Sequence, residues 1–151
     1  MQYIYASPIG EFLITYTEKY ITGLHFDKPK EEHGLVNSIL EQAVSQLDAY
    51  FKGNLRLFKL PIDMIGTDFQ KKVWLSLVNI PYGCTASYGE IAKDINHSKA
   101  SRAVGGANNK NPISIIVPCH RVIGHNGAMT GYGGGLWRKE WLLSHEAKYR
   151  I

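Results

Sequence analysis

The chain has 151 residues, of which 44% are hydrophobic and 20% charged, and its formal net charge is +4 at neutral pH. This length allows one substantial hydrophobic core, or one core with a small satellite domain. The cysteines Cys84 and Cys119 are far apart and belong to no Cys-x-x-Cys pair, which excludes a disulfide framework and a structural zinc site of that kind.

The amino-terminal residues lack the charged and apolar regions of a signal peptide. No apolar run reaches the length of a membrane span. The sparse cysteines suit a reducing compartment. We therefore expect a soluble protein of the cytoplasm.

The first part of the chain has the pattern of a small α/β unit. Short breaks separate three segments rich in β-branched and aromatic residues, at 3–6, 11–17 and 20–26. This pattern predicts an antiparallel meander. Apolar residues then recur at helical spacing from Leu35 to Phe51, and Gly53 follows where such a helix would end. We place this unit at residues 1–60, and it carries no evident catalytic motif.

Beyond residue 60 the pattern becomes helical. Thr67–Gln70 and Ser87–Glu90 both fit the capping box, in which two side chains satisfy the free amide groups at a helix start. We expect the first helix to end at Ile80–Gly83. Its core-facing residues are Phe69, Val73, Trp74 and Leu77.

Two shorter helices follow, expected at residues 88–95 and 99–108. The tight turn between them outlines a helix-turn-helix. The second is unusual because Gly105 and Gly106 lie inside it, at a cost of about 1 kcal/mol each relative to Ala. Its other residues are small apart from one long cation, Arg102. This composition suits close approach to a narrow groove, although Arg102 alone could equally be a phosphate contact or a surface ion pair.

The most informative segment is Ile115–Val122, an apolar run that delivers Cys119 beside His120 and Arg121. We expect the run to be strand-like and the cysteine to lie where it opens into a loop. An imidazole or guanidinium beside a thiol lowers the thiol pKa and favours the reactive thiolate. Neighbours in an extended segment face opposite ways, so His120 would act through a water molecule. A buried structural cysteine beside a surface histidine is the alternative.

A glycine-rich loop at 124–135 would allow a backbone to approach a ligand closely. Residues 136–146 then have the spacing of an amphipathic helix that ends in a carboxylate, Glu146. We expect Trp74, Trp137 and Trp141 to be core residues. The histidines show no metal-ligand spacing, and Cys84 is expected to be a structural thiol.

The charge is uneven along the chain. Residues 1–60 hold six Lys and Arg against seven Asp and Glu, whereas residues 61–151 hold eleven against six. From Ile95 to Lys139 there is no acidic residue, and the cations of this stretch are Lys99, Arg102, Lys110, Arg121, Arg138 and Lys139. A surface built from them would attract polyanions, although a solvated basic face is the usual explanation for such an excess.

Several of these segments resemble, in order and spacing, the signature of the O6-alkylguanine-DNA alkyltransferase family. The match covers roughly Thr67 to Glu146. The matching segments are GTDFQ at 66–70, IPYG at 80–83, SYGEIA at 87–92, SRAVGGA at 101–107, NP at 111–112, PCHRV at 118–122 and WLL at 141–143. A lone Cys-His pair would be weak evidence, but this many ordered segments are specific.

The resemblance implies an α/β protein. A small, variable α/β amino-terminal domain would span residues 1–60, and a mainly helical domain with the helix-turn-helix would span 61–151. The implied function is DNA repair: a monomer binds double-stranded DNA containing O6-alkylguanine through the minor groove and moves the alkyl group irreversibly to its own cysteine. No cofactor or metal is implied. Some relatives bind zinc in the amino-terminal domain, but this chain has no cysteine there.

The resemblance assigns catalytic roles to five residues. Cys119 would be the nucleophile, His120 would take its proton through water, and Glu146 would orient His120. Asn111 would tie the active-site loop to the recognition helix. Tyr88 would contact the target nucleotide and give a proton to the departing guanine.

The resemblance also implies DNA contacts and a base pocket. The damaged oxygen lies inside the duplex, so the nucleotide must be extruded, and Arg102 would fill its place. The implied DNA contacts are Arg102, Tyr88, Lys99, Ala103, Gly106 and Lys110. The implied pocket residues are Val122, Met129, Tyr132 and Gly133, with the backbone carbonyls of Cys119 and Val122 at the exocyclic amine of guanine.

Two functions of other classes fit parts of the pattern. A cysteine hydrolase needs a Cys and a His that face each other, which neighbours in an extended segment do not. A non-catalytic lesion sensor would share the fold, but such proteins typically replace the reactive cysteine with tryptophan, whereas Cys119 is present.

Overall fold

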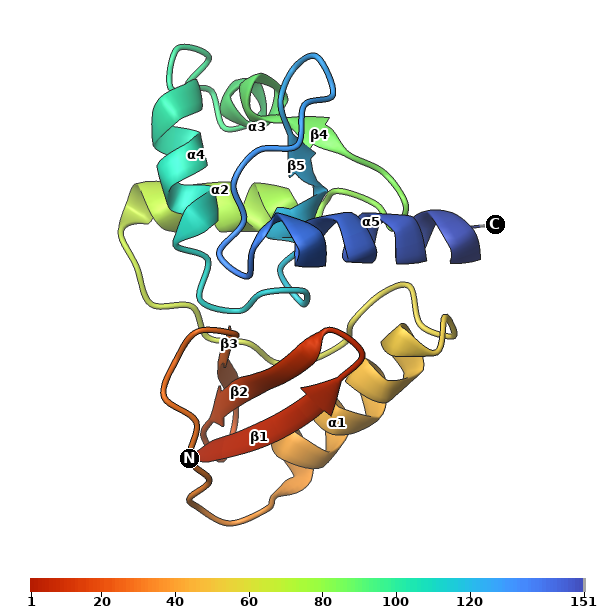
Figure 1. Cartoon of the computed structure of the whole chain (residues 1–151). Coiled ribbons are helices and arrows are strands. Elements are labelled where there is room, and N and C mark those ends of the chain that lie inside the picture. Colours follow the sequence, from red (N-terminus) through yellow and green to blue (C-terminus); the bar gives the residue numbers. More distant parts are fainter. Residues whose placement is uncertain (151) are drawn as a thin grey trace.

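A computed structural model describes residues 1–150 of the chain. Figure 1 shows two parts: a sheet with one helix below, and a group of helices above. The expected fold class, a small α/β unit followed by a mainly helical one, is confirmed. Within the described residues, no helix is long and apolar enough to cross a membrane.

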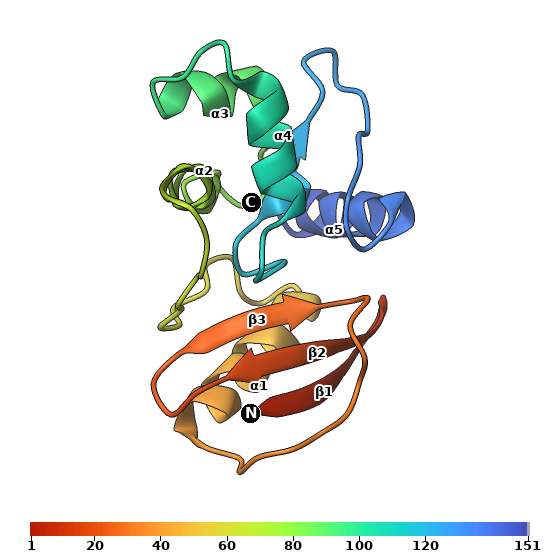
Figure 2. The same ribbon diagram turned by 90° about the vertical axis from the view of Figure 1, so that its left-hand side faces the viewer.

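The lower part contains the expected meander. Strands β1 (Gln2–Ser7), β2 (Gly10–Tyr16) and β3 (Ile21–His25) form an antiparallel sheet in that order. Helix α1 (Ser38–Phe51) covers one face of this sheet, and Figure 2 shows the sheet in front of it. The Asn37 side chain caps α1 by accepting from the Leu40 amide, and Gly53, at φ +81°, turns the chain away after its end.

The upper part holds four helices and two short strands. They are α2 (Asp68–Val78), β4 (Ala86–Ser87), α3 (Tyr88–Asp94), α4 (Ser101–Asn109), β5 (Val122–Ile123) and α5 (Leu136–Tyr149). Both expected capping boxes are present, at the starts of α2 and α3. The short turn between α3 and α4 gives the expected helix-turn-helix, with Asn96 at φ +62° inside it.

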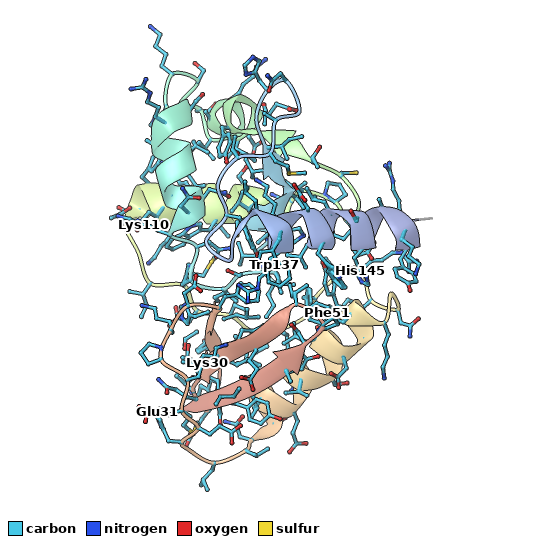
Figure 3. The ribbon with its side chains drawn as sticks, viewed as in Figure 1. Lys30, Glu31, Phe51, Lys110, Trp137 and His145 are labelled. Atoms are coloured by element: carbon cyan, nitrogen blue, oxygen red, sulfur yellow. The ribbon has the colours of Figure 1, made fainter. Side chains whose placement is uncertain are left out.

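The two parts share one continuous core. The β3 backbone bonds to the segment before the Cys119 turn, since the Leu24 amide donates to the Pro112 carbonyl at 2.9 Å. Helix α5 lies along the junction, and its Arg138 Nε donates to the Ile9 carbonyl at 2.7 Å. Figure 3 shows Phe51 of α1 and His145 of α5 close together at this junction, with ring centres 6.4 Å apart.

The expected strand at Ile115–Val117 is wrong. The Val117 amide donates to the Ile113 carbonyl at 3.0 Å, and the Ile116 amide donates to the Ser114 carbonyl at 2.9 Å, so the segment is a tight turn. Ile115 takes φ +72° there. A short buried apolar run looks the same in a strand and in a buried turn, so composition did not separate them.

The last helix also differs from the expectation: Trp137 does not face the core, and α5 continues past Glu146 to Tyr149. Its buried residues are Lys139, Leu142, His145 and Glu146. Polar groups occupy this inner face because each finds a partner there. Trp137, expected in the core, is 56% exposed and lies against the Arg138 guanidinium, 4.6 Å from its ring centre.

Candidate functional site

Cys119 begins a short 3₁₀ turn, Cys119–Arg121, directly after the Ser114–Val117 turn. The Cys119 amide donates to the Val117 carbonyl at 2.8 Å, and the Arg121 amide donates to the Pro118 carbonyl at 3.0 Å. Positive φ is costly for a β-branched residue such as Ile115, so the buried packing of this turn must hold it in place. The turn, rather than an extended strand, therefore presents the thiol.

Asn111 fastens this turn from within. Its Nδ2 donates to the Val117 carbonyl at 2.7 Å, and its Oδ1 accepts from the Ile113 amide at 3.0 Å. Since Asn111 follows α4 by two residues, it links the end of that helix to the cysteine turn. This is the contact that the sequence comparison implied for Asn111.

Glu146 collects five hydrogen bonds in the core beneath Cys119. Its Oε2 accepts from His120 Nε2 and from the Tyr50 hydroxyl, both at 2.7 Å, and from Arg121 Nη2 at 3.0 Å. Its Oε1 accepts from Arg121 Nε at 2.8 Å and from the Gly83 amide at 3.2 Å. Glu146 and His120 are fully buried. The expected His120–Glu146 pair is therefore formed, within a larger network.

The protonation states follow from this network. Burial alone would raise the pKa of Glu146, but the charges and hydrogen bonds of His120 and Arg121 lower it well below its usual range. Burial lowers the pKa of His120 below 6.5 although Glu146 opposes this. A carboxylate only accepts hydrogen bonds, so Nε2 of neutral His120 carries the proton and Nδ1 carries a lone pair. Within the described residues, Nδ1 is buried without a hydrogen-bond partner.

Burial raises the pKa of the Cys119 thiol above 9.0, while Asn111 and Lys139 oppose the rise. The sequence suggested that the neighbouring His120, through a water molecule, or Arg121 would lower this pKa. Both side chains instead bond to Glu146, which neutralises the guanidinium. The thiol is therefore protonated at neutral pH and needs a base when it reacts.

A cavity of about 210 Å³ opens beside the thiol at the junction of the two parts. Its walls include Cys119, Asn108, Tyr132 and Gly133, and the β3 end contributes His25–Lys28. Only some of the expected pocket residues line this cavity. Tyr132 and Gly133 line the cavity, whereas Val122 is fully buried and does not line it, and Met129 is 39% exposed on the loop.

A second hollow, of about 510 Å³, lies between α3, α4 and the loop after β5. Tyr88 and Arg102 line it together with His125. The Tyr88 hydroxyl is 2.5 Å from Thr130 Oγ1, and Tyr88 is not among the residues that line the Cys119 cavity. The structure thus groups Tyr88 with Arg102 rather than with Cys119. A larger hollow, of about 600 Å³, lies on α1 and contains none of the expected site residues.

The outer face of α4 carries the expected DNA contacts. Lys99, Arg102, Ala103, Gly106 and Lys110 are all exposed. A side chain added at Gly106 would meet nothing within 4 Å, so that glycine leaves an open surface. At Gly105 an added Cβ would lie 3.7 Å from the Tyr88 ring, an ordinary contact. Gly106 therefore leaves the outer surface of the helix without a protruding side chain. Neither glycine is needed for packing within the chain.

The acid-free stretch is not one surface, which corrects the expectation from its charge. Arg121 is buried in the Glu146 network, and Lys139 is fully buried. Lys139 Nζ donates to the Val122 carbonyl at 2.5 Å and to the Thr130 carbonyl at 3.0 Å, and so ties the middle of the loop after β5 to that strand. Arg121 and Lys139 donate hydrogen bonds to buried acceptors in the core. Only some of the cations of this stretch therefore face solvent.

Sequence reasoning missed three residues at this site. Tyr50 reaches Glu146 from the other part of the chain, Lys139 holds the loop, and Asn108 lines the cavity. Tyr50 lies in an ordinary amphipathic pattern, and nothing in a single sequence marks it. The sequence did not mark Lys139 either, because the side of the last helix that faces inward depends on what packs against it.

Comparison with known proteins places these features in context. The family model described as "6-O-methylguanine DNA methyltransferase, DNA binding domain" matches residues 68–148, and its "ribonuclease-like domain" model matches residues 2–64. A methylated-DNA–protein-cysteine methyltransferase of Methanosarcina acetivorans is 51% identical, covering 95% of this chain and 96% of the relative. One of Mycobacterium leprae is 50% identical, covering 93% and 88%.

The fold is similar to solved structures as well. The crystal structure of Mycobacterium tuberculosis OGT in complex with DNA superposes with a TM-score of 0.91 at 46% identity, covering 98% of this chain and 93% of that one. These matches extend over both parts of the chain and include the Cys119 turn.

Proposed function

The chain belongs to the 6-O-methylguanine DNA methyltransferase family, and from this premise we propose that Cys119 is the residue that accepts the alkyl group. The function is repair of DNA by transfer of an alkyl group from O6-alkylguanine to a cysteine of the protein itself. One observation carries the assignment to Cys119: this thiol borders a cavity and stands beside a buried His120–Glu146 pair.

His120 acts as the base in this proposal. Its Nδ1 lone pair is the one polar position of the ring that Glu146 leaves free, and a bridging water molecule would carry the thiol proton to it. Glu146 fixes the tautomer and stabilises the imidazolium that forms, the same orienting role that a carboxylate plays in other nucleophile–base systems. Asn111 and Lys139 favour the thiolate, since both lower the pKa of Cys119 against the effect of burial.

The transfer is a displacement at the alkyl carbon. A bond forms between Cys119 Sγ and that carbon while the bond from the carbon to guanine O6 breaks. The thiol proton passes through water to His120, and guanine departs as its anion. The anion then takes a proton from water, and the imidazolium returns its proton to solvent. The product is a thioether, which no residue of the site is arranged to cleave. Each molecule therefore reacts once.

DNA binding involves the α4 face in this proposal. A helix bearing small residues approaches the minor groove closely, and Lys99 and Lys110 meet phosphates at its two ends. Arg102 enters the base stack when the damaged nucleotide rotates out. Tyr88 lines the same hollow as Arg102, so it is better placed to contact the backbone of the target nucleotide than to protonate guanine at Cys119.

The two parts of the chain have different roles in this scheme. Residues 61–151 bind DNA and carry the nucleophile, and the protein acts as a monomer. Residues 1–60 contribute one cavity wall and the Tyr50 hydroxyl.

The test is a mass measurement. Incubation with duplex DNA containing O6-methylguanine is expected to add one methyl group to the peptide that contains Cys119, and the reaction then stops. Cys119→Ser should bind the duplex without being modified, and Cys84→Ser should react normally. Methyl transfer to another residue, or continued release of free product, would overturn the assignment.

A further inference from the structure

Thr130 lies in the middle of the loop after β5, and the alkyl-transfer scheme leaves it without a role. Its hydroxyl is 2.5 Å from the Tyr88 hydroxyl, and its carbonyl accepts from Lys139 Nζ at 3.0 Å. Tyr88 is the first residue of α3, and Lys139 belongs to α5. Thr130 therefore joins the loop to two helices, and the buried lysine fixes the backbone from which its hydroxyl projects.

Tyr88 is held in place by its other neighbours as well. The Ser87 capping box fixes the start of α3, and the Tyr88 ring lies against Gly105 of α4, where an added Cβ would be 3.7 Å from the ring. Tyr88 lines the hollow of about 510 Å³ that Arg102 also lines. The Tyr88–Thr130 contact thus connects the face that carries the expected DNA contacts to the loop that continues to the Cys119 cavity.

Hydrogen-bond chemistry restricts the direction of this contact. Each hydroxyl has a single hydrogen, so only one of the two residues can donate to the other. The phosphate oxygens of a nucleotide and the ring nitrogens of O6-alkylguanine only accept. A Tyr88 hydroxyl that donates to Thr130 has no hydrogen left for any of them. Tyr88 can therefore keep the Thr130 contact and also bond to the extruded nucleotide only if Thr130 is the donor.

We propose that Thr130 is a positioning residue: its hydroxyl donates to Tyr88, and Tyr88 donates to an acceptor of the extruded nucleotide. This inference rests on the proposed function, in which Tyr88 contacts the target nucleotide. A hydroxyl that accepts a hydrogen bond is a stronger donor, so Thr130 strengthens the Tyr88 contact. Because Lys139 already holds the Thr130 carbonyl, little ordering of the loop is needed when the nucleotide enters.

The experiment measures the first-order rate of methyl transfer to Cys119 at saturating duplex DNA that contains O6-methylguanine. Thr130→Val removes the hydroxyl and keeps the branched shape, and it should slow the transfer roughly three- to tenfold, the effect of one hydrogen bond. Thr130→Ser keeps the hydroxyl and should react within about twofold of the wild type. Affinity for undamaged duplex should be unchanged in both variants, because Tyr88 acts on the nucleotide only after extrusion.

A double-mutant cycle tests whether Thr130 acts through Tyr88. In a Tyr88→Phe background, Thr130→Val should cause no further loss of rate, since the hydroxyl that it supports is already absent. Thr85→Val is the matched control, because it changes an exposed threonine before β4 and should leave the rate unaltered in either background. Urea denaturation reports whether each variant is folded, and Thr130→Ala repeats the test with a smaller side chain.

The outcomes separate this inference from the proposed function. Unchanged transfer in Thr130→Val, or losses that add in the double variant, would show that Thr130 does not act through Tyr88. An equal loss in Thr130→Ser would make Thr130 a packing residue of the loop. Each of these results overturns the inference while leaving alkyl transfer intact. If the wild-type protein takes no methyl group from the duplex, the proposed function itself fails.

Discussion

The Tyr50 hydroxyl and Glu146 are joined by a 2.7 Å hydrogen bond that crosses from the amino-terminal unit to the base of the cysteine site. The Glu146 oxygen that accepts this bond also accepts from His120 Nε2. One residue earlier, His145 Nε2 is 2.7 Å from the Tyr50 carbonyl. Helix α1 therefore holds α5 by two polar contacts at the point where the Glu146 carboxylate projects.

Tyr50→Phe should move the pH dependence of the reaction. The phenol withdraws charge from Glu146, so its loss leaves a carboxylate that stabilises imidazolium more strongly and raises the pKa of His120. As the pH is lowered, His120 then becomes protonated at a higher pH than in the wild type. The acidic limb of the rate profile should therefore shift to higher pH. The measurement is the rate of Cys119 alkylation by O6-benzylguanine between pH 5 and 9.

The phenylalanine ring keeps the aromatic contacts of Tyr50 with Phe58 and His145. Tyr82→Phe is a suitable control, because it removes a neighbouring hydroxyl that has no hydrogen-bond partner among the described residues. A uniform loss of rate at every pH in Tyr50→Phe, without a shift, would show that Tyr50 only supports the fold.

Glu146→Gln should destabilise the protein. It leaves the buried Arg121 guanidinium without its counter-charge, and breaking a buried ion pair in this way costs roughly 3–5 kcal/mol. Urea denaturation at pH 7 measures the change. A decrease of only a few tenths of a kcal/mol in the free energy of unfolding would contradict a structural role for this pair.

The same pair predicts how stability depends on pH. The pKa of Glu146 is lower in the folded protein than its ordinary 4.5, so its contribution is fully present above that value and is lost as the pH falls. The pKa of His120 is also lowered, from 6.5, so the unfolded chain binds the additional proton below about that pH. Both effects have the same sign: the free energy of unfolding should fall progressively from about pH 6.5 downward. A maximum of stability below pH 5 would contradict both assignments.

Arg102→Ala should separate extrusion from chemistry. We expect repair of O6-methylguanine in duplex DNA to slow by about ten- to a hundredfold, since base extrusion costs a few kcal/mol. Reaction with free O6-benzylguanine should remain nearly intact because that substrate needs no extrusion. Lys99→Ala removes a neighbouring exposed charge and should weaken duplex binding without slowing the chemical step. Equal losses on both substrates in Arg102→Ala would indicate damage to the pocket.

Duplex affinity should depend on salt through the few cations that α4 exposes. Two phosphate contacts, from Lys99 and Lys110, predict a log-log slope of roughly −2. Lys99→Glu with Lys110→Glu should weaken binding to damaged and undamaged duplex alike and flatten the slope. Lys52→Glu changes an exposed charge on α1 and should leave the slope unaltered. Fluorescence anisotropy across a salt series gives these values, and a wild-type slope near zero would exclude α4 as the docking face.

Local patterns were sufficient for much of the fold. The meander, the two capping boxes and the helix-turn-helix depend on contacts between residues a few positions apart, so the chain order alone predicts them. Ile115–Val117 and Trp137 were misjudged for the opposite reason. Whether a short apolar run is a strand or a buried turn, and which side of an amphipathic helix faces inward, depends on what packs against them.

The order and spacing of residues are enough to identify the family, the cysteine–histidine pair and the segments around it. The electrostatics of that pair depend on contacts between distant segments, which appear only in the folded protein. Glu146 binds His120, Arg121 and Tyr50, which lie 25 to 96 positions away in the sequence. The side chains of His120 and Arg121 therefore pair with Glu146 and not with Cys119. The physical reason is that burial and hydrogen bonding, not sequence adjacency, set the pKa of an ionisable group.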